Sequence, residues 1–167
     1  MAEEMINNMH ELNEANLKGM EKTVTEYRID DAGGEGWMLK LGDCVERVKE
    51  LADGSIDYTI FSPPFASLYT YSNSPRDMGN CKDDGEFFIH FKFLISEMLR
   101  VTKSGRLLSF HCMNLPTTKT HFGYIGIRDF RGELIRAFED AGWIYHSEVC
   151  IWKDPVTAMQ RTKALGL

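Results

Sequence analysis

The sequence predicts a single α/β domain in which a mostly parallel sheet is covered by helices. Short apolar runs that suit strands alternate with stretches whose apolar residues recur every three or four positions, as in amphipathic helices. This alternation is typical of parallel strands joined by helical crossovers. With 167 residues, of which 43% are hydrophobic and 26% charged, the chain has the length and composition of one globular domain.

The predicted elements follow a peripheral N-terminal segment. Residues 1–26 carry spaced apolar side chains among Asn and Glu, which predicts a marginal amphipathic helix or a flexible arm. The Gly- and Asp-rich run 30–36 predicts a loop. Beyond it we expect strands at 37–41, 56–61, 106–112 and 143–152 (the last straight or bent into a pair) and helices at 45–51, 83–103 and 129–141.

Two of these helices carry apolar stripes that predict the core. The stripe of the longest helix consists of Phe87, Phe91, Leu94, Met98 and Val101. The stripe of the last helix consists of Phe130, Leu134 and Phe138. The segments 62–82 and 113–126 contain too many turn-forming residues for regular structure, and the first also carries aromatic side chains. A long loop with aromatic residues in a small domain is usually functional.

Polar residues follow three of the predicted strands. These runs are Gly42-Asp43-Cys44, Ser62-Pro63-Pro64-Phe65 and Ser109-Phe110-His111-Cys112. Ligands of parallel sheets bind beyond the carboxyl ends of the strands, and right-handed crossovers would bring the three runs to one rim. We therefore expect a binding site at that rim.

The run Ser62-Pro63-Pro64-Phe65 suits a planar ligand that carries an amino group. Two successive prolines fix the backbone and remove two N–H donors, so the carbonyls of Ser62 and Pro63 are free to accept hydrogen bonds. The Ser62 hydroxyl adds a further acceptor, and Phe65 offers a face for stacking. Holding an amino nitrogen by its hydrogens directs its lone pair toward an electrophile.

The run Asp57–Phe65 resembles the catalytic motif of the DNA amino-methyltransferases. That motif reads Asp, Asn or Ser followed by Pro-Pro and an aromatic residue, and this chain is most similar to the N4-cytosine/N6-adenine members whose catalytic half precedes the cofactor-binding glycine motif. The upstream strand–Gly42-Asp43-Cys44–helix unit is similar to that family too. So are the downstream runs Asp77-Met78-Gly79-Asn80, Lys103-Ser104-Gly105 and Ile151-Trp152-Lys153-Asp154-Pro155. The resemblance covers roughly residues 37–155.

The resemblance implies a Rossmann-like methyltransferase fold with helices on both faces of the sheet, incomplete on its C-terminal side. It implies S-adenosyl-L-methionine as cofactor, double-stranded DNA as partner and no metal. A flipped base would be methylated directly on its amino nitrogen, and a Ser-first motif favours N4-cytosine over N6-adenine. The implied site residues are Ser62, Pro63, Pro64 and Phe65 for catalysis, Asp43 and Cys44 for the cofactor, and Tyr69, Tyr71, Asn80, Ser109 and His111 for the substrate.

Two departures from the family pattern bear on activity. Some members carry an Asp on the strand that here reads Leu108–Cys112, so no base is assigned. The family's Phe-x-Gly-x-Gly loop does not occur in these 167 residues, and Gly33-Gly34-Glu35-Gly36 precedes a strand instead of joining a strand to a helix. We therefore expect an arm and loop at 1–36, the catalytic region at 37–155 and the start of a further segment at 156–167. A second chain or a later region would supply the glycine loop and the DNA-recognition part.

Other readings of the same residues remain open. On one interpretation the chain is an active enzyme. On the other it is a non-catalytic remnant or one half of a split methyltransferase. A third class, methylation of a protein glutamine or an RNA base, requires a glycine motif upstream of Ser62. If the Ser62–Phe65 run binds no ligand, it is a plain turn after a strand. Asp43 also suits the cap of a helix. Tyr69 and Tyr71 either stack on bases or order their loop.

The remaining polar residues favour ordinary roles. We expect Cys44 and Cys112 to be small buried residues, all four cysteines to be free thiols, and His121 and His146 not to bind metal. The net charge of −6 speaks against a nucleic-acid partner unless a local basic face exists. The N-terminus lacks a signal-peptide pattern and no apolar run is long enough to span a membrane, so we expect a cytoplasmic protein without a membrane partner.

Overall fold

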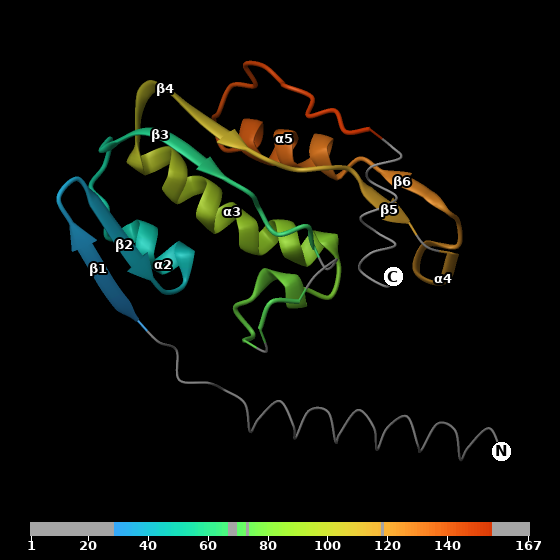
Figure 1. Ribbon diagram of the computed structural model, residues 1–167. Coiled ribbons are helices and arrows are strands. Elements are labelled where there is room, and N and C mark those ends of the chain that lie inside the picture. Colours follow the sequence, from blue (N-terminus) through green and yellow to red (C-terminus); the bar gives the residue numbers. More distant parts are fainter. Residues whose placement is uncertain (1–28, 67–69, 73, 118, 155–167) are drawn as a thin grey trace, which may run out of the picture.

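The centre of the computed structural model is a pair of parallel strands, β3 (Ile56–Phe61) and β4 (Thr102–Phe110) (Figure 1). The structure describes residues 29–154 except 67–69, 73 and 118, so the predicted arm, the tail and Tyr69 lie outside the described residues. From Tyr58 opposite Leu107 to Phe61 opposite Phe110 the register is regular. The prediction for β3 is confirmed, whereas β4 begins at residue 102 and not at residue 106 as expected.

The core lies between this strand pair and two helices, α3 (Asp84–Val101) and α5 (Phe130–Asp140). Both helices begin at a capping aspartate: Asp83 accepts a hydrogen bond from the Glu86 amide, and Asp129 accepts one from the Gly132 amide. The two predicted stripes are buried, and their rings meet in the core: Phe87 contacts Phe130, and Phe91 contacts Phe138. The sequence-based assignment of the core is therefore confirmed.

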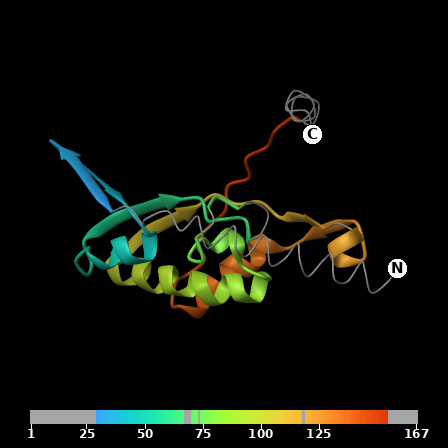
Figure 2. The ribbon, with the colours of Figure 1, turned by 90° about the horizontal axis from the view of Figure 1, so that it is seen from below.

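All the long helices lie on one side of the strand pair. Figure 2 shows α3, α5 and the short helix α2 (Cys44–Lys49) below β3 and β4, with no described helix above them. The outward side chains Tyr58, Ile60 and Leu107 are accordingly 52%, 73% and 54% exposed. Parallel sheets are normally covered on both faces. The mixed α/β class is as predicted, but within the described residues helices on both faces are not found.

The glycine-rich run before the first predicted strand is not a loop. Residues of β1 (Asp30–Gly34) pair antiparallel with β2 (Trp37–Leu41), and Gly36 forms the turn with a φ of 79°. β2 therefore joins this hairpin and not the β3–β4 pair, contrary to the expectation of one mostly parallel sheet. As a result, Asp43 is positioned by α2 and not by the rim of a common sheet.

The C-terminal third also differs from the prediction in two places. The expected irregular segment 113–126 includes β5 (Leu115–Thr117), which pairs antiparallel with β6 (Gly126–Arg128), and the short helix α4 (Lys119–Phe122). The expected strand at 143–152 is absent: residues 143–154 have no regular structure, and Ile144 and Val149 are 88% and 87% exposed. No described helix is long and apolar enough to cross a membrane.

Candidate functional site

The carboxyl ends of β3 and β4 bring Ser62 beside His111. The His111 amide donates to the Phe61 carbonyl at 2.9 Å, which extends the strand pairing by one residue. The Ser62 hydroxyl then donates to the His111 carbonyl at 3.0 Å. Just before this point Tyr58 Oη donates to Ser109 Oγ at 2.8 Å on the open face of the sheet. Two of the three predicted strand ends therefore meet as expected.

The residues after Ser62 turn sharply into the core. Pro63 is buried, Phe65 is half-buried against the core, and Ala66 is fully buried. Ala66 has a φ of 48°, a left-handed conformation that a residue with a Cβ adopts only at a cost. Two prolines on one side and a buried left-handed turn on the other hold the motif in a single backbone path. The Ser62 side chain, in contrast, is exposed to solvent.

The loop after the motif is organised by Asp77. Its Oδ2 accepts hydrogen bonds from the amides of Tyr71 and Ser72 at 3.0 and 2.6 Å, and its Oδ1 accepts from the Gly79 amide at 2.8 Å, at the start of the short 3-10 helix η2 (Met78–Asn80). The Asn80 amide group donates to the carbonyls of Ser72 and Ser74 at 2.8 and 3.0 Å. Asn80 is thus used to order the loop, while the Tyr71 ring is 67% exposed. Their roles toward a substrate remain predictions.

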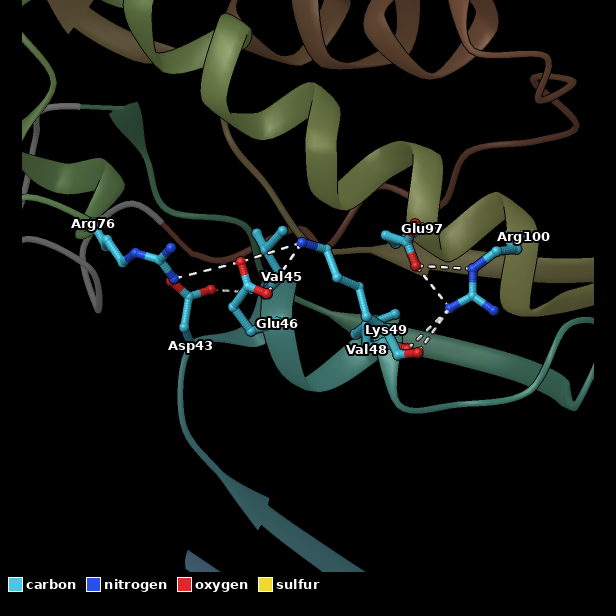
Figure 3. A network of polar contacts seen from close by, with 8 residues as sticks. All are labelled: Asp43, Val45, Glu46, Val48, Lys49, Arg76, Glu97 and Arg100. Atoms are coloured by element: carbon cyan, nitrogen blue, oxygen red, sulfur yellow. Dashed lines mark hydrogen bonds and ion pairs between the residues drawn. The ribbon is translucent and has the colours of Figure 1, made fainter. Parts of the chain in front are cut away.

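Asp43 is the N-cap of α2 and is also joined to this loop. Its Oδ1 accepts from the Val45 amide at 2.9 Å, so the predicted capping role is confirmed. Its Oδ2 lies 3.1 Å from Arg76 Nη1, and the same nitrogen lies 3.5 Å from Glu46 (Figure 3). Sequence reasoning did not single out Arg76; its only signal was that it is the one cation in the irregular segment before Lys82.

Cys44 follows Asp43 and is exposed, contrary to the expectation of a buried residue, while Cys112 is half-buried. Neighbouring atoms nevertheless desolvate the Cys44 sulfur, which raises the pKa of its thiol, and the charge of Asp43 raises that pKa further. Burial likewise raises the pKa of Cys112. All four cysteines are unpaired in the structure. A thiol whose pKa is raised is a poor nucleophile at neutral pH.

The charges around these residues are largely paired. Arg76 is paired with Asp43, and Arg131, the cation that influences Cys112, is paired with Glu148. Lys103 and Arg106 both contact Asp57 at the other end of β3. No group of three potential metal ligands occurs among the described residues. The described surface near the motif therefore shows no unpaired arginine cluster that would attract phosphates.

Comparison with known proteins gives only distant matches. No family model matches the sequence, and no curated protein does. Three solved structures of TTHA0409, a proposed DNA modification methylase from Thermus thermophilus, are similar at TM-scores of 0.47, 0.46 and 0.47 with 15%, 16% and 19% identity; the third was crystallised with S-adenosyl-L-methionine. Each match covers 60% of this chain but only 36–39% of the other. This likeness is too remote to carry an argument about the function of this chain.

Proposed function

We propose that this chain carries the base-binding half of an S-adenosylmethionine-dependent DNA methyltransferase that acts on an exocyclic amino group. The proposal depends on one observation: at the joined ends of β3 and β4, Ser62-Pro63-Pro64-Phe65 is held in a fixed path beside His111. Rigid acceptors next to a stacking surface are what a planar base with an amino group requires. N4-cytosine is the favoured target and N6-adenine the second.

In this proposal the motif binds and orients the amino group. The Ser62 hydroxyl already donates its hydrogen to the His111 carbonyl, so its oxygen lone pairs remain to accept from a ligand N–H. The carbonyl groups of Ser62 and Pro63 act as further acceptors, and the half-buried ring of Phe65 supports the plane of the base. Accepting both amino hydrogens localises the nitrogen lone pair and aims it away from the motif.

Asp43 is the residue that fits the cofactor. Its side chain is only 13% exposed, and its two oxygens carry one hydrogen bond from Val45 and one from Arg76. Arg76 is itself 57% exposed, so ligand hydroxyl groups can take its place as donors to Asp43 Oδ2. When bound, S-adenosylmethionine supplies an electrophilic methyl group. Arg76 and Lys49 balance the carboxylates of Asp43 and Glu46, so Asp43 would hold a ligand by hydrogen bonds and not by an excess of negative charge.

A second candidate function is supported by the open face of the strand pair. Tyr58, Ile60 and Leu107 leave an apolar face of the kind that is normally covered. One half of a split enzyme, which binds DNA or a partner chain without being active alone, would leave such a face. The two candidates differ in whether this chain alone transfers methyl groups.

The direct test is to incubate the full chain with S-adenosylmethionine labelled in its methyl group and with unmethylated DNA. Label should appear in the DNA, and both Ser62→Ala and Phe65→Ala should lower the rate by at least about tenfold, since they remove an acceptor and the stacking surface. The matched control is Ser96→Ala on α3, whose hydroxyl only contacts its own helix at Lys92. DNA that stays unlabelled would contradict activity of this chain alone and favour the second candidate. Labelling that is equal in the unmodified chain and all the variants would disprove catalysis by this motif.

A further inference from the structure

Arg76 is the residue that connects the two parts of the proposed site. It belongs to the loop that follows the Ser62–Phe65 motif, yet its guanidinium contacts Asp43 and Glu46 at the beginning of α2, 33 and 30 positions away in the sequence. Figure 3 shows Arg76 reaching these carboxylates from the loop side. The Asp43 side chain is nearly buried at 13% exposure, whereas Arg76 is 57% exposed.

Several hydrogen bonds join the described residues of the loop that carries Arg76. Asp77, the next residue, accepts three amide hydrogen bonds, and the Asn80 side chain ties two carbonyls of the same loop. The Arg76 amide itself donates to Ser74 Oγ at 3.2 Å. These contacts lie within the loop, whereas the Arg76 side chain joins the loop to α2.

We propose that Arg76 is a positioning residue that closes the loop over Asp43 and is displaced when a ligand binds Asp43. This inference rests on the proposed function, since it takes Asp43 as the cofactor contact. Only 13% of the Asp43 side chain is exposed and Arg76 lies against its Oδ2, so a ligand hydroxyl that reaches this carboxylate competes with Arg76. The loop beside the base pocket and the cofactor carboxylate are therefore coupled, and the coupling acts equally in both directions.

The test uses adenosine, which has no charge of its own, so that salt acts on binding only through the protein. Arg76→Gln should bind adenosine about threefold to fivefold more tightly than the unmodified chain at low salt, the range expected for removing an exposed ion pair. Raising the ionic strength from about 0.01 M to about 1 M screens the Arg76–Asp43 attraction. Salt should therefore tighten adenosine binding to the unmodified chain and leave Arg76→Gln unchanged.

Two further variants separate this role from a general effect on folding. Arg76→Lys keeps the charge and should retain the salt dependence. Arg136→Gln removes one positive charge from α5 and should behave as the unmodified chain. As a second readout, saturating adenosine should speed hydrogen exchange at the Tyr71 and Ser72 amides in the unmodified chain, because the freed loop opens more often, and should change it little in Arg76→Gln.

The outcomes distinguish the two proposals. Equal adenosine affinity in all variants, without salt dependence, would overturn the role of Arg76 and leave Asp43 as a ligand contact. Weaker binding by Arg76→Gln would also overturn it, since Arg76 would then support the ligand. A failure of every variant to bind either adenosine or S-adenosylmethionine would overturn the assignment of Asp43 itself and, with it, the coupling.

Discussion

Ala66 combines two properties that rarely occur together, a left-handed backbone and complete burial. The first favours glycine, and the second limits the volume of any side chain at this position. Directly after the proposed base-binding motif, the side chain at position 66 therefore limits which backbone path the chain can take. The residues Phe65-Ala66 carry no local signal for this turn, because alanine has no preference for positive φ.

Substitutions at Ala66 should separate strain from packing. Ala66→Gly removes the strain and should change the free energy of unfolding by less than about 1 kcal/mol. Ala66→Val adds volume to a closed site and a β-branched residue to a left-handed backbone, and should destabilise the chain by about 2–3 kcal/mol. Urea denaturation measures both. Equal stability of the two variants would contradict the buried left-handed turn.

The neighbours Asp43 and Cys44 allow an electrostatic test. Asp43→Asn keeps the helix cap but removes the negative charge that helps to raise the pKa of the Cys44 thiol. The thiol pKa should therefore fall, and iodoacetamide should modify Cys44 faster at about pH 8, as peptide mass spectrometry would show. Cys81 serves as an internal control, since its pKa is raised by burial and by Glu86, Asp77 and Asp83. An unchanged ratio of the two rates would show that Asp43 does not act on Cys44.

At the scale of elements, α2 is a short helix that is held at both ends. Asp43 caps its beginning, and at its end the Arg100 guanidinium donates to the Val48 carbonyl at 3.3 Å (Figure 3). The same guanidinium donates to the Leu51 carbonyl at 2.9 Å. Glu97 orients this guanidinium at 2.7 Å. A helix of six residues is not stable alone, so these contacts decide where the proposed cofactor carboxylate lies.

Arg100→Lys should therefore loosen α2, because a single ammonium cannot reach the separate carbonyls that the planar guanidinium fork contacts. We expect a loss of about 1–2 kcal/mol in unfolding free energy and faster hydrogen exchange in α2. Arg136→Lys on α5 is the matched control. If α2 amides exchange equally in both variants, Arg100 does not hold the end of the helix.

Some elements could be predicted from local sequence patterns and others could not. β3, α3 and α5 follow from local periodicity and from capping residues such as Asp83 and Asp129, and the structure confirms them. The hairpins β1–β2 and β5–β6 were missed because antiparallel pairing depends on a partner segment and not on the apolar pattern of one strand. For the same reason the contact of Arg76 with Asp43 has no local signal, whereas the Ser62–Phe65 motif could be found from its residue types alone.

At the scale of the whole molecule, the described residues form a sheet with one covered and one open face. Phe61, Leu108 and Phe110 point into the core, while their neighbours Tyr58, Ile60 and Leu107 point outward. The exposed apolar residues of the β1–β2 hairpin, among them Trp37 at 58% and Leu39 at 61%, add to the uncovered surface. A domain with this much uncovered apolar surface is typical of one that binds a further element.

Ile60→Thr tests whether that face is open. Threonine keeps the preference for a strand, so the unfolding free energy should stay within about 0.5 kcal/mol, while binding of a hydrophobic dye and self-association should decrease. Ile89→Thr, at a 63% exposed position on α3, is the control for removing any surface isoleucine. A destabilisation of several kcal/mol by Ile60→Thr would show instead that another part of the chain covers the face.

The central claim is that the Ser62–Phe65 motif directs methylation to an exocyclic amino group. The most direct measurement is the mass-spectrometric analysis of nucleosides from DNA incubated with the full chain and S-adenosylmethionine. We predict N4-methylcytosine, or otherwise N6-methyladenine, in amounts that fall at least about tenfold with Ser62→Ala. Methylation of a ring carbon, as in 5-methylcytosine, or amino methylation that Ser62→Ala leaves unchanged would contradict the claim.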